Sequence, residues 1–331
     1  MDKEKKRRIR IAGTGFSVPE RILTNQDLEK MVDTSDEWIV SRSGIKERRI
    51  VDETQASSDL GIEAGRLAIK NAGLKTKDID AIIVATATPD TLFPSTACWI
   101  QKGLKIDHVP AFDMSAGCTG FIYGMILTES LILSGTFKRV LLIAAETLTR
   151  ITNWKDRSTC VLFGDAAGAA VFEESPDDSG ILSHYWKADG ELGELLIQPG
   201  GGSRNPATAE TVAKDMHYLQ MRGNEVFKHA VKRMTEAARE ALKKVGMTHE
   251  DVDYLLPHQA NIRIIEATGK RLKLPRERVF SNIHKYGNVS AATIPVGLHE
   301  ISEQKILKKG DILVMDAFGA GFTWGAVVYR W

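Results

Sequence analysis

The sequence predicts an α/β protein made of two similar halves, packed as layers of helices and sheets. Helix-like and strand-like segments alternate along the 331 residues, and one pattern of segments occurs twice. The strands are short, continuous apolar runs, which is typical of buried, mostly parallel strands. A chain of this length exceeds what one core usually supports, so either two domains or one duplicated domain is expected.

The first copy of the pattern begins with an Ala-rich segment at 63–73, which predicts a helix ending at Gly73. An acidic turn at 78–80 and an apolar strand at 81–85 follow. The second copy has the same order at 236–246, 251–253 and 254–256, an offset of 236 − 63 = 173. Later segments also correspond: 103–106 with 271–274, 140–143 with 312–315, and 168–171 with 325–328. We therefore divide the chain into residues 1–174 and 175–331.

Composition excludes several classes of protein. The formal net charge of +1 and 43% hydrophobic residues favour neither a nucleic-acid-binding surface nor disorder. The basic segment from Lys3 to Arg10 predicts a solvated leader to a first strand, because Gly13 and Gly15 interrupt the apolar stretch that a targeting signal needs. Apolar runs fall far short of the roughly 20 residues that span a bilayer, so no membrane association is expected.

The three cysteines, Cys98, Cys118 and Cys160, form no CxxC pair and no cluster with histidine. This pattern argues against a disulfide framework and against a zinc site, so no metal is expected and a reducing cytoplasm fits best. Two glycine-rich segments also fail as nucleotide motifs. Pro19 stands where the helix of a dinucleotide fingerprint should continue, and the run 200–202 lacks a Walker lysine.

Three residues form a candidate catalytic set: Cys118, His258 and Asn288. Each follows a predicted strand, at 110–113, 254–256 and 279–282, and ligands of open α/β sheets bind at such carboxyl ends. A thiol accepts an acyl group as a thioester, while an imidazole and an amide can donate hydrogen bonds to an oxygen that gains negative charge. Cys118 precedes a long apolar helix, whose N-terminal dipole should lower the pKa of the thiol.

Each of the three residues also has a purely structural interpretation. A lone cysteine is by default a small buried apolar side chain, which is our interpretation of Cys98 and Cys160. His258 could be a hydrogen-bonded core histidine, and Asn288 after Gly287 could be a turn residue. Only the combination of the three is specific.

Four segments together resemble β-ketoacyl-acyl-carrier-protein synthase III, the initiating condensing enzyme of bacterial fatty acid synthesis. They are Ala116-Gly-Cys118-Thr-Gly-Phe121, Pro257-His258-Gln-Ala-Asn261, Gly287-Asn288-Val-Ser-Ala-Ala292 and Phe318-Gly-Ala-Gly-Phe-Thr-Trp-Gly325. The resemblance covers almost the whole chain and includes Thr34-Ser-Asp-Glu-Trp-Ile-Val-Ser-Arg42 and Asp156-Arg157. It implies a thiolase-like fold, layered as αβαβα, and usually a homodimer.

The resemblance implies a substrate and a mechanism as well. Cys118 would take acetyl or another short acyl group from coenzyme A, which is a substrate and not a permanently bound cofactor. Malonyl-acyl-carrier protein would then lose carbon dioxide, and His258 and Asn288 would hold the enolate oxygen. The backbone N–H groups of Cys118 and Ala320 would hold the thioester oxygen, although Ala320 replaces a glycine found in some members.

The same motif matching assigns binding residues. Trp38 and Arg157 would enclose the adenine of coenzyme A, Arg42 would lie near its phosphates, and Asn224 and Asn261 would line the pantetheine tunnel. Phe93 would reach across the dimer to bound the acyl chain. The matched segments also contribute Thr34, Gly223, Phe227 and Ala260 to the coenzyme A site, and the exposed bases Lys228, Arg263, Lys270 and Arg271 would receive the acidic carrier protein.

Two other functions share part of this pattern. A papain-type cysteine hydrolase has the same order of Cys, His and Asn, and the separation 258 − 118 = 140 lies within that family's range of roughly 130–150 residues. Its local cysteine signature is missing, however, and a duplicated α/β chain has no place there. A non-catalytic protein that binds acyl carrier protein or coenzyme A would need no thiol at all.

Overall fold

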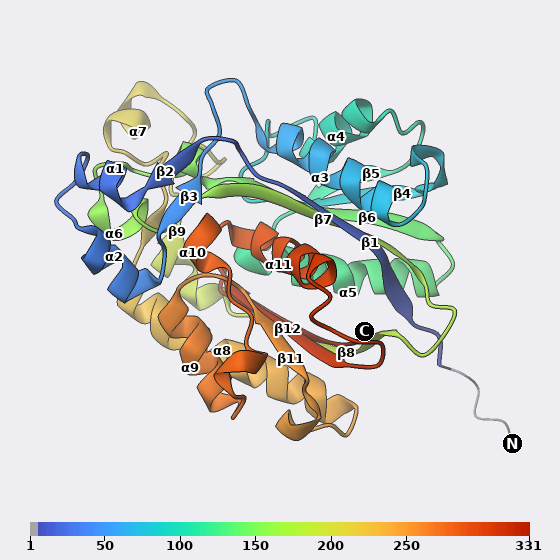
Figure 1. Ribbon diagram of the computed structural model, residues 1–331. Helices are drawn as coiled ribbons and strands as arrows, with labels where there is room; N and C mark the ends of the chain where they lie inside the picture. The colour runs from blue at the N-terminus through green and yellow to red at the C-terminus, as the bar shows by residue number, and fades with distance from the viewer. Residues whose placement is uncertain (1–5) are drawn as a thin grey trace, which may run out of the picture.

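A computed structural model describes residues 6–331 (Figure 1). Lys3 and Lys5 of the basic leader lie outside the described residues, and the first strand begins at Ile9. Arg7, directly before it, is exposed and forms a hydrogen-bonded ion pair with Glu174, with 2.7 Å between Nε and Oε1.

The first sheet belongs to the N-terminal half. Within residues 6–331 it has five strands in the order β1-β7-β6-β4-β5. Strands β5, β4 and β6 are parallel, and β7 and β1 continue the sheet antiparallel. The bounds are β1 (Ile9–Ser17), β4 (Ala81–Ala85), β5 (Ala111–Met114), β6 (Arg139–Thr147) and β7 (Asp165–Glu174).

The second sheet repeats this topology. In the described part of the chain its order is β11-β12-β13-β8, with β11 and β12 parallel and the other two antiparallel. The bounds are β8 (Gly180–Ala188), β11 (Tyr254–Pro257), β12 (Ile312–Gly319) and β13 (Thr323–Arg330). The predicted strand at 279–282 is wrong: only Val279 pairs, in an isolated parallel bridge with Leu255, at the place that β5 holds in the first sheet. The Asn282 N–H donates to the Gln259 side chain and not to a strand.

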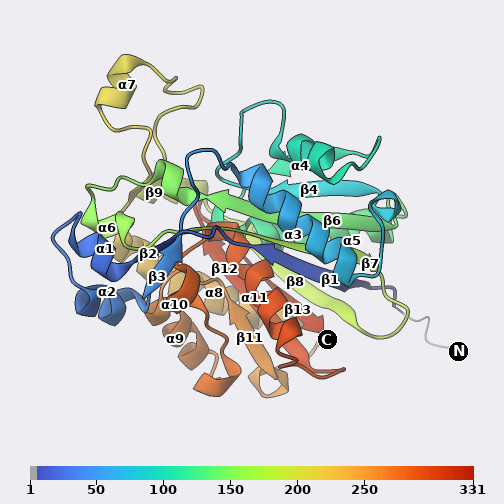
Figure 2. The ribbon, with the colours of Figure 1, turned by 45° about the horizontal axis from the view of Figure 1, so that its top comes forward.

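Helices separate and cover the two sheets, which gives the αβαβα layers that the sequence predicts (Figures 1 and 2). Helices α3 (Ser57–Asn71) and α4 (Thr96–Leu104) cover the outer face of the first sheet, and α8 (Gly223–Lys244) covers the outer face of the second, with α9 (Ile262–Arg271) packed on α8. Helices α5 (Gly120–Leu133) and α11 (Thr293–Glu303) lie between the sheets. The two copies thus share one central helical layer.

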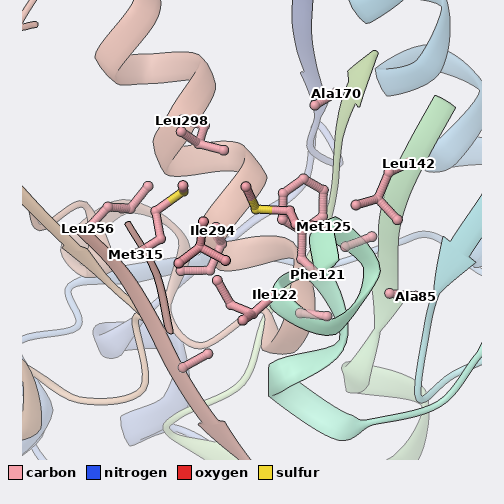
Figure 3. Packing of buried hydrophobic residues seen from close by; sticks show 14 of the residues in the cluster. Ala85, Phe121, Ile122, Met125, Leu142, Ala170, Leu256, Ile294, Leu298 and Met315 are labelled. Atoms are coloured by element: carbon pink, nitrogen blue, oxygen red, sulfur yellow. The ribbon is translucent and has the colours of Figure 1, made fainter. Parts of the chain in front are cut away.

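The apolar composition of α5 follows from its position. Phe121, Ile122 and Met125 of this helix are fully buried and pack, with Ile294 and Leu298 of α11, against residues of both sheets (Figure 3). Because a helix between two sheets has no solvated face, it needs apolar side chains all round. Two further apolar clusters lie outside the sheets, one under α3 and α4 and one under α8 and α9.

Short elements complete the fold and surround the ends of the strands. Their bounds are β2 (Ile22–Thr24), α1 (Asn25–Glu29), α2 (Asp36–Ser43), β3 (Glu47–Arg49), η1 (Thr76–Asp78), η2 (Gly117–Thr119), η3 (Leu148–Ile151), α6 (Arg157–Cys160), η4 (Gly190–Leu195), β9 (Leu196–Ile197), α7 (Ala209–Ala213), β10 (Gln220–Met221), η5 (His249–Asp251), η6 (Arg276–Arg278), α10 (Ile283–Tyr286) and η7 (Ser290–Ala292). Helix α7 and its loops project from the body of the molecule (Figure 2). Among the helices described, none has the length and apolarity needed to cross a membrane.

Candidate active site

Cys118 lies in the short turn η2, between the end of β5 and the start of α5. Gly117 before it has a φ of +52°, a conformation that side chains with a Cβ rarely adopt. The backbone turn therefore depends on glycine. Asn288 occupies the related place in the second copy, two residues before η7, which leads into α11. The duplication therefore places a thiol and an amide near the N-terminal ends of the two central helices.

Two backbone segments approach each other closely at Cys118. A Cβ atom on Gly319 would lie 2.5 Å from the Cys118 nitrogen, and one on Gly117 would lie 2.9 Å from the Ala320 nitrogen. Because both distances are too short for a real Cβ, glycine is required at both positions. The backbone nitrogens of Cys118 and Ala320 therefore each lie against the facing segment, beside the thiol-bearing residue.

His258 follows β11 and is 2% exposed. Its backbone N–H donates to the Asp316 carbonyl over 2.8 Å, and its ring Nδ1 lies 2.7 Å from the Thr293 hydroxyl oxygen. Burial lowers the pKa of His258 to about 3, so the ring is neutral at pH 7. Since Nδ1 contacts Thr293, Nε2 is the nitrogen left for a substrate.

Asn288 is buried, and its orientation is fixed by its neighbours. The Ser290 backbone N–H donates to Asn288 Oδ1 over 2.9 Å, while the Asn288 backbone N–H donates to the Leu162 carbonyl over 2.8 Å. Ser290 has a φ of +49°, in the left-handed region. Because the amide oxygen is engaged, the side chain offers its NH₂ group to a ligand.

The expected lowering of the Cys118 pKa by the helix dipole is wrong. Burial raises the pKa of the thiol to about 12, which outweighs a lowering by the Ser290 hydroxyl. The Glu146 carboxylate raises the pKa of Cys118 further. The helix dipole favours the thiolate, but desolvation of the thiolate by the surrounding protein is the larger effect.

Sequence reasoning missed three polar residues beside the set: Glu146, Ser290 and Thr293. Glu146 is fully buried at the end of β6, and its Oε2 accepts from the Ala87 N–H over 3.0 Å and from the Thr88 hydroxyl over 2.9 Å. Burial raises the pKa of Glu146 to about 7. The sequence does indicate that Glu146 is unusual, because it is a single acidic residue at the end of an apolar strand.

A cavity of about 500 Å³ connects the candidate residues. All four predicted catalytic residues line it, namely Cys118, His258, Asn288 and Ala320. Most of the predicted coenzyme A residues line it too: Trp38, Arg42, Gly223, Asn224, Phe227, Ala260 and Asn261. Arg42 and Asn224 are exposed, whereas His258 and Asn288 are buried, so the cavity runs from the surface to the thiol.

An aromatic and cationic cluster stands where this cavity opens. The Trp38 ring has Arg42 over it at 4.9 Å and Arg157 at 5.1 Å, measured from guanidinium carbon to ring centroid. Arg157 Nη1 also donates to the Asp33 carbonyl over 2.7 Å. Arg157 lies outside the cavity lining, as does Thr34, whose buried hydroxyl has no hydrogen-bond partner among residues 6–331.

The four predicted docking bases are all exposed. Arg263 lines the cavity opening and lies over the Phe227 ring at 5.3 Å, and Lys228 follows Phe227 on α8. Lys270 and Arg271 lie at the other end, in the last turn of α9. The four bases therefore form a strip along α8 and α9 that begins at the cavity.

Phe93 is not brought to the cavity within one chain. It lies between β4 and α4 and is 84% exposed, next to Leu92 at 81%. Two large side chains that are this exposed and apolar are available for contact with another surface.

No group of three or more His, Cys, Asp or Glu residues in the described range could hold a metal ion.

The duplicated α/β fold, with a partly buried thiol, two backbone segments in close approach and two neutral donors on one cavity, defines the class of acyl-condensing enzymes that use a cysteine. Models of the family 3-oxoacyl-[acyl-carrier-protein] synthase III match residues 112–190, and a model of its C-terminal part matches residues 242–331. The chain belongs to this family. The papain-type alternative is therefore wrong.

Relatives match over the full length. The chain is 56% identical over 321 residues to a β-ketoacyl-[acyl-carrier-protein] synthase III of Caldanaerobacter subterraneus, covering 97% of each chain. It is 51% identical over 325 residues to that of Natranaerobius thermophilus, covering 97% of this chain and 99% of the relative. The crystal structure of 3-oxoacyl-[acyl-carrier-protein] synthase III from Aquifex aeolicus is 48% identical, with a TM-score of 0.90 over 98% of this chain and 100% of that one.

Proposed function

We propose that this protein condenses a short acyl-coenzyme A with malonyl-acyl-carrier protein, with loss of carbon dioxide, and thereby initiates type II fatty acid synthesis. The observation that carries the proposal is the convergence of Cys118, His258 and Asn288 on one cavity. Family membership supports the same reaction.

In the first half-reaction, Cys118 attacks the acyl thioester. The Sγ–H bond breaks, a new thioester forms on Sγ, and the proton leaves with the coenzyme A thiol. Negative charge develops on the acyl oxygen, which the N–H groups of Cys118 and Ala320 stabilise. Because burial raises the pKa of the thiol to about 12, the proton leaves Sγ in the step in which Sγ attacks the acyl carbon.

In the second half-reaction, the malonyl carboxylate leaves as carbon dioxide, and its bonding electrons form an enolate. His258 Nε2–H and the Asn288 amide donate to the enolate oxygen. The carbanion then attacks the thioester on Cys118, and the bond between the acyl carbon and Sγ breaks. This step releases β-ketoacyl-acyl-carrier protein and leaves Cys118 as a thiolate, which takes up one proton from solvent to restore the thiol. Neutral donors suit this step, since a buried carboxylate at either position would repel the malonyl group.

The coenzyme A portion would bind along the cavity. Gly223, Asn224, Phe227, Ala260 and Asn261 would contact pantetheine, and Arg42 would pair with phosphate. Adenine would stack on Trp38, with Thr34 at the edge of the site. Because Arg157 already lies over the ring at 5.1 Å, an adenine between them requires the guanidinium to move outward.

We assign partners by charge and exposed apolar surface. The strip of Lys228, Arg263, Lys270 and Arg271 would attract an acidic carrier protein and raise its rate of encounter at low salt. A second copy of the chain would cover Phe93, which would then bound the acyl chain in the partner. The division at residues 1–174 and 175–331 and a location in the reducing cytoplasm remain part of the proposal.

Intact-protein mass after incubation with acetyl-coenzyme A tests the function directly. The wild-type protein should gain one acetyl group, which malonyl-acyl-carrier protein then removes as product. Cys118→Ser should gain none, whereas Asn288→Ala should be acetylated but fail to discharge. If Cys118→Ser condensed at the wild-type rate, the proposal would be wrong.

A further inference from the structure

The Thr293 hydroxyl lies between His258 and a backbone carbonyl. Its Oγ1 lies 2.7 Å from His258 Nδ1 and 3.0 Å from the Ser290 carbonyl oxygen. Thr293 is 2% exposed and His258 is also 2% exposed, so water has little access to this contact. The hydroxyl has one proton and two possible acceptors.

A neutral imidazole carries one N–H, and its position decides what the ring offers to a substrate. If the Thr293 proton goes to Ser290, Nδ1–H must donate to Thr293, and Nε2 presents a lone pair. If the Thr293 proton goes to Nδ1, Nε2 carries the hydrogen and is a donor. The first tautomer repels an enolate oxygen, and the second binds it.

The proposed role of His258 as a donor to the enolate requires the second tautomer, and the surrounding contacts permit it. The Ser290 carbonyl already accepts the backbone N–H of Thr293, so it remains hydrogen-bonded when the hydroxyl turns away. Turning the hydroxyl to Nδ1 therefore leaves no buried group of this cluster without a partner.

We propose that Thr293 is a positioning residue for decarboxylation, because its hydroxyl donates to His258 Nδ1 and so keeps the hydrogen on Nε2, facing the substrate. This inference rests on the proposed function and assigns a role within it. Asn288 and His258 are then oriented by one segment, since Ser290 fixes the amide through its N–H and Thr293 fixes the imidazole. The two donors of the site would be set by residues 288–293.

The test compares Thr293→Val, which keeps the shape but removes the hydroxyl, with Thr293→Ser, which keeps the hydroxyl. Thr235→Val is the matched control, because the Thr235 hydroxyl is also buried but donates to the Val231 carbonyl within α8. Acetylation of Cys118 is followed by intact mass, and decarboxylation by release of carbon dioxide from malonyl-acyl-carrier protein.

We expect Thr293→Val to acetylate within about threefold of wild type but to decarboxylate roughly 10- to 100-fold more slowly, somewhat less than the 10²–10³-fold typical for complete loss of an oxyanion donor. Thr293→Ser and Thr235→Val should decarboxylate near the wild-type rate. Equal rates for Thr293→Val and wild type would overturn the proposal. A failure of wild-type acetylation would instead count against the proposed function.

A second readout needs no activity and covers the case in which Thr293→Val does not fold. ¹⁵N NMR of histidine-labelled wild-type protein, with His258 assigned by its loss in His258→Gln, reports which ring nitrogen carries the hydrogen. The proposal expects protonated Nε2 and unprotonated Nδ1 in wild type and in Thr293→Ser. A protonated Nδ1 in wild type would refute it.

Discussion

The side-chain oxygen of Asn288 accepts a hydrogen bond from the backbone N–H of Ser290, with 2.9 Å between Oδ1 and the nitrogen. Only the amide oxygen can accept this bond, so the NH₂ group of Asn288 must face the other way. A strained backbone conformation at Ser290, with a φ of +49°, holds the N–H in place. The donor that we assign to the enolate is thus set by a backbone contact.

This contact predicts that Asn288→Asp is more damaging than Asn288→Ala. A carboxylate can still accept the Ser290 N–H, but it offers no donor and adds a negative charge where the enolate forms. Loss of one oxyanion donor typically costs about 10²–10³ in kcat, and the charge should add to this. Carbon dioxide release should be slower in Asn288→Asp than in Asn288→Ala, with acetylation of Cys118 retained in both. The reverse order would contradict the assigned orientation.

The close backbone approach at the thiol predicts that Gly319→Ala blocks acetylation. Its Cβ would lie 2.5 Å from the Cys118 nitrogen, so the two segments must move apart and the paired N–H groups must separate. We expect acetyl transfer to fall at least about 100-fold, the loss typical of one missing donor. Ala320→Gly is the control, because it removes a methyl group without displacing the backbone. Near-wild-type acetylation of Gly319→Ala would exclude this oxyanion site.

Much of the fold follows from the sequence, because the repeated segments dictate a repeated topology. The correspondence of 63–73 with 236–246 predicts two sheets of one strand order, and Cys118 and His258 each follow the end of a strand. The segment 279–282 shows the limit: an apolar run predicts a strand, but the Gln259 side chain takes the Asn282 N–H that a strand would use. That contact depends on packing between distant segments.

The composition of the site was predictable, but its electrostatics were not. Cys118, His258 and Asn288 stand in short motifs, whereas Glu146, Ser290 and Thr293 matter only because folding places them beside that set. The local sequence indicates a helix dipole that lowers the pKa of Cys118, yet burial between two sheets raises it to about 12. Desolvation sums over all surrounding segments, so no local pattern reports it.

We expect the buried carboxyl of Glu146 to make the reactivity of the Cys118 thiol depend on pH. Glu146 ionises as pH rises through about 7, and its charge then raises the pKa of the thiol. Glu146→Gln keeps an acceptor for the Ala87 N–H but removes the charge. Alkylation of Cys118 by iodoacetamide should therefore be severalfold faster in Glu146→Gln at pH 8.5, where one pKa unit changes the thiolate population about tenfold.

At pH 6 the two proteins should react at similar rates, since the wild-type carboxyl is then largely protonated. Peptide mass spectrometry distinguishes Cys118 from the other two cysteines. A rate ratio that does not change between pH 6 and pH 8.5 would show that the Glu146 charge does not reach the thiol.

The aromatic cluster at the opening predicts a selective effect on acyl-coenzyme A binding. Removal of the Trp38 ring by Trp38→Ala takes away the stacking surface, while Cys118 and its neighbours stay in place. A stacking or cation–π contact contributes about 1–2 kcal/mol, so KM for acetyl-coenzyme A should rise about tenfold with little change in kcat. Trp186→Ala, an exposed tryptophan on β8 outside the cavity, is the control. An equal KM in both variants would show that Trp38 does not contribute to binding of acetyl-coenzyme A.

We expect the buried carboxyl of Asp316 to make the stability of the folded protein depend on pH. This residue of β12 is fully buried, and neither side-chain oxygen has a hydrogen-bond partner among the residues described. Burial raises the pKa of Asp316 to about 8, from an ordinary value of 3.8. The folded protein thus binds a proton that the unfolded chain has lost, at every pH between about 4 and 8.

A proton bound only by the folded state stabilises it at low pH, and this contribution falls as pH rises towards 8. Asp316→Asn has no proton to lose, so its thermal midpoint relative to wild type should rise between pH 5 and pH 9. The free-energy difference between the two proteins should change by up to about 4 kcal/mol, because the three pH units from 5 to 8 lie below the folded-state pKa and above that of the unfolded chain. Asp107→Asn, at an exposed position, should keep a constant offset. If the offset of Asp316→Asn were also constant, the carboxyl would have to be ionised in the folded protein, and a bound water or cation would then have to compensate its charge.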